Sequence, residues 1–248
     1  MSSTDLNETL NKQQLVAVNC NEGNKLVLAG AGSGKTRVLT YRVAKLIKDF
    51  NIRPSDIMAL TFTNKASREM KQRLESLLRI SSQGLWFGTF HGICRRILKI
   101  HWREAELSER FTILDSQDQL RMVKRIIKTN NLDDKLYDAK SVQSFINRKK
   151  DKGIRSNKIS EKDDEIYIII YKEYEAILKQ THSVDFADLI LKTYELFSDN
   201  ENILFYYVKR FKHIMVDEFQ DTNLLQFKLL KLLNNNTGSM YAVGDDDQ

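Results

Sequence analysis

The segment from Ala29 to Thr36, AGAGSGKT, has the composition and spacing of a phosphate-binding loop. It matches the pattern G-x-x-x-x-G-K-[ST] except that Ala29 stands at the first glycine position. In such a loop, glycines let successive backbone N–H groups turn toward a phosphate, and the following helix presents the positive end of its dipole. Lys35 would neutralise the terminal phosphates, and Thr36 would ligate Mg²⁺. A plain glycine-rich turn explains neither residue at this spacing, so the segment predicts a site for MgATP.

A second chemical feature is the acidic pair Asp217 and Glu218, which directly follows the apolar stretch 214–216. Acids at the end of a buried strand are costly unless they hold a cation, so Asp217 is predicted to ligate Mg²⁺. Glu218 is then predicted to be the base that orients the attacking water. An isolated Asp-Glu pair is equally well explained as solvated surface. Together with the loop, however, the pair predicts a hydrolytic nucleotide site, and a small-molecule kinase would have less need of Glu218.

These residues require a framework that positions them, and the sequence contains one on both sides of its middle. Short apolar stretches that end in glycine or polar residues alternate with segments of helical pattern. The predicted strands are 25–29, 57–62, 85–89, 213–217 and 240–244, and the predicted helices are 35–50, 65–78, 92–102 and 223–233. Continuous apolar strands that alternate with helices are typical of a parallel α/β sheet covered on both faces. The predicted fold class is therefore α/β.

The stretch from about 111 to about 211 has a different character. It contains one glycine, Gly153, and no proline, so little interrupts a helix there. Its apolar residues recur at helical spacing, as in Leu120, Val123 and Ile127. We predict an all-helical insertion between the third and fourth strands of the sheet.

The composition is typical of a folded globular chain. The 248 residues are 42% hydrophobic and 29% charged, which excludes a disordered or collagen-like chain. The longest apolar run, 166–171, is far shorter than the ~20 residues that a membrane-spanning helix needs, and the acidic N-terminus does not resemble a signal peptide. A cytoplasmic location is therefore expected. Cys20 and Cys94 are isolated and the four histidines form no ligand cluster, so neither a disulfide framework nor a zinc site is expected. The net charge of +6 is compatible with a polyanionic partner.

Seven motifs, in order along the whole chain, resemble those of the UvrD/Rep family of superfamily I DNA helicases. They are 10–14, the loop to Thr36, 61–65, 88–92, 184–189, 216–222 and 243–248. The resemblance implies a P-loop NTPase with a RecA-like parallel sheet (domain 1A, residues 1–92 and 212–248, truncated at its C-terminus) and an inserted all-helical domain (1B, residues 93–211). It also implies an ATP-dependent 3′ to 5′ DNA helicase motor that uses ATP and Mg²⁺. Such a motor couples ATP hydrolysis to translocation on single-stranded DNA, in DNA repair.

The resemblance assigns roles to individual residues as well. Gln14 resembles the glutamine that reads adenine, Arg37 a residue that packs on the nucleotide, and Gln248 the sensor between the γ-phosphate and DNA. The catalytic residues implied are Lys35, Thr36, Asp217, Glu218 and Gln248, with Thr36 and Asp217 as metal ligands. The nucleotide-binding residues implied are Gln14, Ala29, Gly30, Ala31, Gly32, Ser33, Gly34, Lys35, Thr36 and Arg37.

Two further stretches are predicted to contact DNA. The resemblance implies that a single-strand groove is lined by Thr61, Phe62, Thr63, Asn64, Thr89 and His91. Phe62 offers a stacking face, with core packing as its alternative. Core packing is the better explanation for Phe90, and a structural role is an equal one for His91. In the basic run 148–158, Lys149, Lys150 and Lys152 are predicted to contact duplex phosphates. Because such runs are most often solvated loops, that alternative stays open.

The chain stops at Gln248, within the last motif, whereas members of the family continue with a second RecA-like domain that contributes arginine fingers. We therefore expect an N-terminal fragment that binds ATP and DNA but does not unwind, because half a motor cannot step. Its expected partners are single-stranded DNA, a duplex junction, the missing second domain and repair proteins. Two alternatives stay open: the motor part of a helicase-nuclease, and an inactive module that binds DNA or a protein without turnover.

Overall fold

The computed structural model describes residues 9–20, 23–30, 32–79, 84–160, 163–234 and 238–245. Contacts within the chain divide it into two compact units. The first unit comprises Met1–Ile93, Asn200–Thr222 and Leu230–Gln248, and the second comprises Cys94–Asp199 and Asn223–Leu229. Helices α5 (Phe90–Ile100) and α11 (Leu224–Asn234) are divided between the units. Within the described ranges, no helix has both the length and the apolar character needed to cross a membrane.

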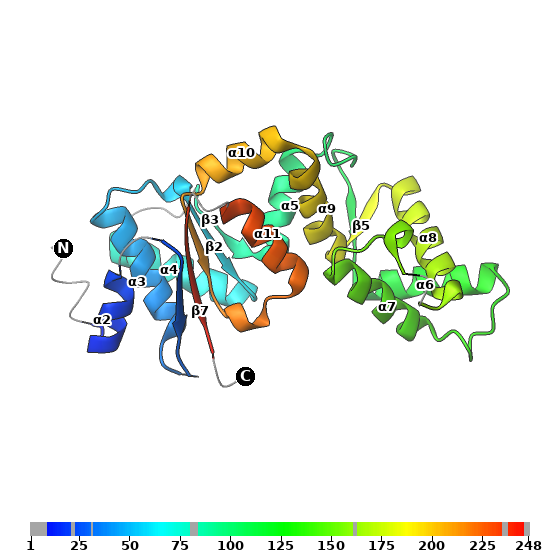
Figure 1. Ribbon diagram of the computed structural model, residues 1–248, viewed down its shortest axis with the longest axis horizontal. Coiled ribbons are helices and arrows are strands. Elements are labelled where there is room, and N and C mark those ends of the chain that lie inside the picture. The colour runs from blue at the N-terminus through cyan, green and yellow to red at the C-terminus, as the bar shows by residue number, and fades with distance from the viewer. Residues whose placement is uncertain are drawn as a thin grey trace. The chain divides into compact units, whose positions relative to one another are not determined.

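A five-stranded, fully parallel sheet forms the centre of the first unit (Figure 1). Its strands are β1 (Lys25–Leu28), β2 (Ile57–Thr61), β3 (Trp86–Thr89), β6 (His213–Val216) and β7 (Ser239–Gly244). They lie in the order β1-β7-β6-β2-β3, so that Ala59 in β2 is flanked by Met215 and Phe87. The predicted α/β class with a parallel central sheet is confirmed, and every predicted strand coincides with an observed one to within a residue at either end.

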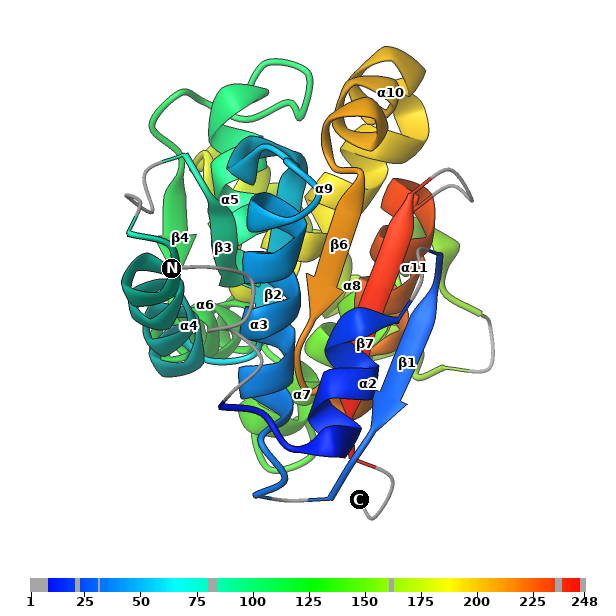
Figure 2. The same cartoon turned by 90° about the vertical axis from the view of Figure 1, so that its left-hand side faces the viewer.

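The first unit also contains helices, some of which lie over the sheet. They are α2 (Lys12–Asn19), α3 (Lys35–Lys48), α4 (Asn64–Leu78) and α10 (Glu201–Arg210), with the short 3-10 helices η1 (Pro54–Asp56) and η3 (Phe219–Asp221). Figure 2 shows α2 and α3 lying over one face of the strands. Apolar residues of α3 such as Leu39 and Val43 pack there with Ala59 and Met215 of the sheet. Burial of this face therefore fixes α3, and with it the loop that precedes α3.

Helix α10 groups with the first unit, although the predicted insertion extends to residue 211. The rings of Tyr207 and Phe211 pack edge-on against Trp86 of β3, with centroids 5.9 and 5.2 Å away. Arg210 also donates a hydrogen bond from Nε to the carbonyl oxygen of Ser55 at 3.4 Å. These contacts favour an insertion that ends near residue 199.

The second unit is mostly helical. It contains α6 (Ser116–Thr129), α7 (Ala139–Asp151), η2 (Ser156–Lys158), α8 (Glu165–Gln180) and α9 (Phe186–Asp199), and its core includes Val123, Ile146 and Tyr174. The prediction of an all-helical insertion is wrong in one respect, because β4 (Thr112–Leu114) and β5 (Ser183–Asp185) form a parallel pair. Each of these strands has three residues, which is too few for a recognisable period of two in the sequence.

Candidate active site

The loop between β1 and α3 has the backbone geometry that a phosphate-binding loop needs. Gly32 and Gly34 adopt positive φ angles of 74° and 86°, a region that glycine enters without steric cost. Gly34 precedes the first turn of α3, and its carbonyl oxygen accepts a hydrogen bond from the N–H of Val38 at 2.9 Å. A Cβ atom at Gly34 would also lie 3.0 Å from Nε2 of Gln14. Both observations explain why glycine occupies position 34. Ala31, also predicted to bind nucleotide, lies outside the described residues.

Lys35 holds a buried positive charge inside this loop. Its Nζ donates to the carbonyl oxygen of Ala29 and to Oδ2 of Asp245, both at 2.9 Å, and its side chain is 8% exposed. Burial by itself would lower the pKa of Lys35, but the hydrogen bond to Asp245 and the charges of Asp245, Glu218 and Asp217 together outweigh it, so the pKa is raised. The amine is therefore an ammonium group, as neutralisation of a phosphate requires.

Thr36 and Asp217 bring two oxygen ligands together at the end of β6. The hydroxyl of Thr36 donates to Oδ2 of Asp217 at 2.9 Å, and the N–H of Asp217 donates to the carbonyl oxygen of Leu60 at 2.9 Å. Burial, aided by the charge of Glu218, raises the pKa of Asp217 against the opposing hydrogen bond from Thr36. A hydroxyl next to a buried carboxylate is an oxygen donor set that fits Mg²⁺. The pair predicted as metal ligands therefore lies in contact.

Glu218 follows Asp217 in a strained backbone conformation. Its φ of 49° places it in the left-handed region, which is uncommon for a residue with a side chain. Its N–H donates to Oδ1 of Asp217 at 3.2 Å, and its Oε2 accepts from Nε2 of Gln220 at 2.8 Å. A rare conformation held at the end of a strand is often associated with a functional position, which agrees with the role predicted for Glu218.

Gln14 and Arg37 lie beside the loop. Gln14 belongs to a capping box with Asn11 at the start of α2, and its Nε2 donates to the carbonyl oxygen of Ser33 at 2.9 Å. Arg37 donates to the carbonyl oxygen of Thr9, and its guanidinium lies 5.6 Å from the centre of the Tyr41 ring. Their contacts with adenine and with the nucleotide stay predictions. Gln248, the predicted sensor, lies outside the described residues.

Asp245 and Gln220 have no role predicted from the sequence, yet both contact the predicted catalytic residues. Asp245 pairs with Lys35, from which it is 210 positions away in the chain. Gln220 accepts a hydrogen bond from the N–H of Asp245 at 3.0 Å. The available signal was their place within the recognised motifs 216–222 and 243–248, but a motif does not state which side chains touch.

The residues predicted to line a single-strand groove end or follow β2 and β3, at the same carboxyl edge of the sheet as the loop and Asp217. Thr63 and Asn64 are exposed, and Phe62 is half-buried with its ring 5.5 Å from that of Phe90. Phe90 is 2% exposed, which confirms core packing for this ring.

Three of the predicted groove residues, Thr61, Thr63 and Thr89, use their hydroxyl groups in local hydrogen bonds. The hydroxyl of Thr61 donates to the carbonyl oxygen of Thr63 at 3.1 Å, and the hydroxyl of Thr89 accepts from the N–H of Gly92 at 3.1 Å. His91 is half-buried, and burial lowers the pKa of its imidazole. These contacts shape the turns after β2 and β3, and a role in DNA binding stays a prediction for all six residues.

In the basic run, only part of the charge faces solvent. Arg148, Lys152 and Lys158 are exposed, whereas Lys149 pairs with Asp163 at 2.6 Å. Lys150 is 0% exposed and pairs with two buried carboxylates. The charge of Lys150 is therefore not accessible to DNA, and the predicted contact of Lys150 with duplex phosphates is wrong.

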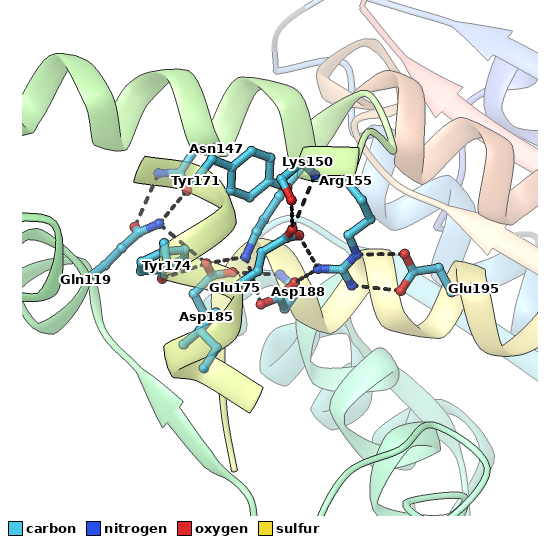
Figure 3. Close-up of polar contacts among 12 residues, drawn as sticks. Gln119, Asn147, Lys150, Arg155, Tyr171, Tyr174, Glu175, Asp185, Asp188 and Glu195 are labelled. Atoms are coloured by element: carbon cyan, nitrogen blue, oxygen red, sulfur yellow. Dashed lines mark hydrogen bonds and ion pairs between the residues drawn. The ribbon is translucent and has the colours of Figure 1, made fainter. Parts of the chain in front are cut away.

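The carboxylates around Lys150 belong to an ion network of six charged side chains, buried at Lys150, Asp185 and Asp188 and partly exposed at the other three, which Figure 3 shows: Lys150, Arg155, Glu175, Asp185, Asp188 and Glu195. Lys150 Nζ lies 2.6 Å from Asp185 Oδ2 and 2.8 Å from Asp188 Oδ2. Arg155 donates to Asp188 at 2.7 Å and, through two nitrogens, to both carboxylate oxygens of Glu195 at 2.7 Å. The network thereby ties the basic run to β5, α8 and α9.

Charge balance within this network is reflected in two opposite pKa shifts. Burial by itself would raise the pKa of Asp188, but Lys150 and Arg155 outweigh it and hold that pKa well below its ordinary value. Burial and the charge of Asp188 raise the pKa of Asp185, against the opposing effect of Lys150. The hydroxyl of Tyr174 also donates to Asp185, at 2.9 Å.

Comparison with known proteins identifies the class to which this fold and site belong. The chain is a member of the UvrD/Rep helicase family, because it matches the UvrD/REP helicase N-terminal domain over residues 10–248. The resemblance predicted from the seven motifs is thereby confirmed.

Individual relatives are DNA helicases. The whole chain is similar to DNA helicase II of Haemophilus influenzae, with 47% identity over 255 residues, and to DNA helicase II of Escherichia coli, with 45% identity over 251 residues. It covers 35% of each of these two proteins. The ATP-dependent DNA helicase PcrA of Bacillus subtilis is 40% identical over 250 residues, which are 99% of this chain and 34% of PcrA. The chain thus spans about a third of the length of these curated relatives.

Proposed function

We propose that this chain is the ATP-binding part of an ATP-dependent DNA helicase motor that moves 3′ to 5′ on single-stranded DNA. In this proposal the first unit is a RecA-like P-loop domain and the second is an inserted domain. The observation that carries the proposal is that, at one edge of a parallel sheet, Thr36 contacts Asp217 and the neighbouring Lys35 contacts Asp245. The names of the relatives, DNA helicase II and PcrA, support DNA as the substrate. A role in repair, repair partners and a cytoplasmic location stay predictions.

Each residue of the candidate active site would have a separate role in ATP hydrolysis. The ammonium group of Lys35 would neutralise charge on the terminal phosphates, and the N-terminus of α3 would contribute backbone N–H groups. Thr36 and Asp217 would hold Mg²⁺, which neutralises phosphate charge when bound. Glu218 would accept a proton from the attacking water, because its carboxylate stands at the same strand end.

A single-turnover assay with the chain in excess over radiolabelled ATP tests this function. We expect slow release of phosphate that depends on Mg²⁺, and we expect single-stranded DNA to change its rate constant. The Lys35→Ala variant should release none above background. If the chain binds ATP but releases no phosphate with or without DNA, the inactive binding module is the correct alternative.

We further propose that the exposed part of the basic run contacts duplex phosphates through Arg148, Lys152 and Lys158. Gly153 gives this segment a turn with a φ of 80°, and the ion network fixes the segment at Arg155. Phosphate contacts carry no sequence preference and release counterions. Binding through this run should therefore depend strongly on salt.

Replacing Arg148, Lys152 and Lys158 by Ala should reduce the slope of log affinity against log salt by about 0.9 for each phosphate that is no longer neutralised. The measurement is fluorescence anisotropy with a duplex that carries a 3′ single-stranded tail, across a range of salt concentrations. Replacing three exposed cations of α6, Lys124, Arg125 and Lys128, is the matched control. Equal slopes for the two triple variants would show that the basic run is a solvated surface that does not contact DNA.

A further inference from the structure

The side-chain amide of Gln220 connects two strand ends of the candidate active site. Its Nε2 donates to Oε2 of Glu218 at 2.8 Å, just beyond β6. Its Oε1 accepts from the backbone N–H of Asp245 at 3.0 Å, just beyond β7. Gln220 itself lies in η3, the short helix that follows the acidic pair. The amide of Gln220 therefore accepts from the backbone just beyond β7 and donates to a carboxylate just beyond β6.

The backbone of β7 comes close to this amide. A Cβ atom at Gly244 would lie 3.1 Å from Oε1 of Gln220 and 3.6 Å from its backbone nitrogen. Glycine at 244 therefore allows the end of β7 to approach η3, and a side chain there would push Oε1 of Gln220 away. Glycine at position 244 thus leaves room for the side chain of Gln220 in its present position.

These contacts form a continuous series of hydrogen bonds that starts and finishes in the loop. In order, the series contains Lys35, Asp245, Gln220, Glu218, Asp217 and Thr36. It begins and ends at neighbouring residues of the loop, so the ammonium of Lys35 and the carboxylate of Glu218 belong to one connected structure. Three of its five links use backbone or side-chain groups that Gln220 or Glu218 supply.

We propose that Gln220 is a positioning residue that orients the carboxylate of Glu218 for hydrolysis and fixes its position relative to the end of β7. This inference rests on the proposed function. A glutamate side chain has several rotatable bonds, and a general base must reach its proton within hydrogen-bonding distance. The donor Nε2 restricts the rotation of the carboxylate, while the bond to Asp245 fixes the amide that supplies this donor.

The test is Gln220→Met, which keeps the approximate length of the side chain and removes both hydrogen bonds. Hydrogen-bond partners that orient metal ligands typically contribute about 10- to 100-fold to activity, and a residue that orients a general base is expected to act on the same scale. We expect the single-turnover rate constant of ATP hydrolysis to fall by about that factor, with the Kd of a fluorescent ATP analogue changed less than about twofold. The matched control is Gln226→Met, which removes a hydrogen bond to the N–H of Asn223 at the start of α11. It should leave the rate constant unchanged.

A double-mutant cycle with Glu218→Gln separates positioning from a merely structural effect. If Gln220 acts through Glu218, the double variant should hydrolyse ATP at the rate of Glu218→Gln alone. Additive losses, or an unchanged rate constant in Gln220→Met, would overturn the inference. If Glu218→Gln itself has the rate of the unaltered chain, the assignment of the base in the proposed function fails, and the positioning of it by Gln220 fails with it.

Discussion

Replacing Lys150 by Met should lower the free energy of unfolding by about 3 to 5 kcal/mol. Lys150 is fully buried and lies between Asp185 and Asp188, so its removal leaves two buried carboxylates without their shared counterion. Met fills a similar volume, and the loss is therefore mainly electrostatic. Guanidinium unfolding of the chain, followed by circular dichroism, would measure the change.

The control for this prediction is Lys149→Met, one position earlier in the same helix. Lys149 also pairs with an acid, Asp163, but its side chain is 18% exposed and that of Asp163 is 24% exposed. Ion pairs that water reaches contribute about 0 to 1 kcal/mol, so this variant should unfold close to the unaltered chain. Equal losses for the two variants would show that the buried position of Lys150 in the ion network is not what stabilises the second unit.

Replacing Glu218 by Gln should lower the rate constant of ATP hydrolysis by about 10² to 10⁴, the usual contribution of a general base. The amide keeps the shape of the side chain but cannot take a proton from water. Binding of MgATP should change little, since Lys35, Thr36 and Asp217 are left in place. Single-turnover hydrolysis and a titration with a fluorescent ATP analogue measure the two effects separately.

A matched Glu→Gln control is available at Glu69, an exposed residue of α4 that lies 3.9 Å from Lys65. Its replacement removes the same charge from the same unit and should leave hydrolysis unchanged. If Glu69→Gln and Glu218→Gln have the same rate constant, Glu218 is not the base, and the strained backbone at this position needs another explanation.

The parallel sheet and the loop could be predicted from the sequence because their signals are local. Each strand contains a continuous apolar stretch, and Lys35 and Thr36 follow the glycines at a fixed spacing. The three-residue strands β4 and β5 carried no such signal. Their pairing depends on contacts between segments far apart in the chain, which periodicity does not report.

The site could be predicted only as far as single motifs allow. The pairing of Lys35 with Asp245 and the bridge through Gln220 join distant segments, so spacing did not indicate them. Membership of a basic run predicts a surface charge at Lys150, and this prediction is wrong because the side chain is buried. A helical signal was present nonetheless, since Val142, Ile146 and Lys150 recur every four residues and all three are buried.

A titration with a fluorescent ATP analogue in the presence of Mg²⁺ shows whether this chain binds MgATP through its loop. Lys35→Ala should weaken binding by about 10- to 100-fold, because charge-assisted hydrogen bonds to phosphate contribute about 1.5 to 3 kcal/mol. Lys45→Ala, on the same helix and paired with Asp49 at 3.0 Å, should bind like the unaltered chain. Equal binding by the Lys35→Ala and Lys45→Ala variants would show that the loop does not bind MgATP.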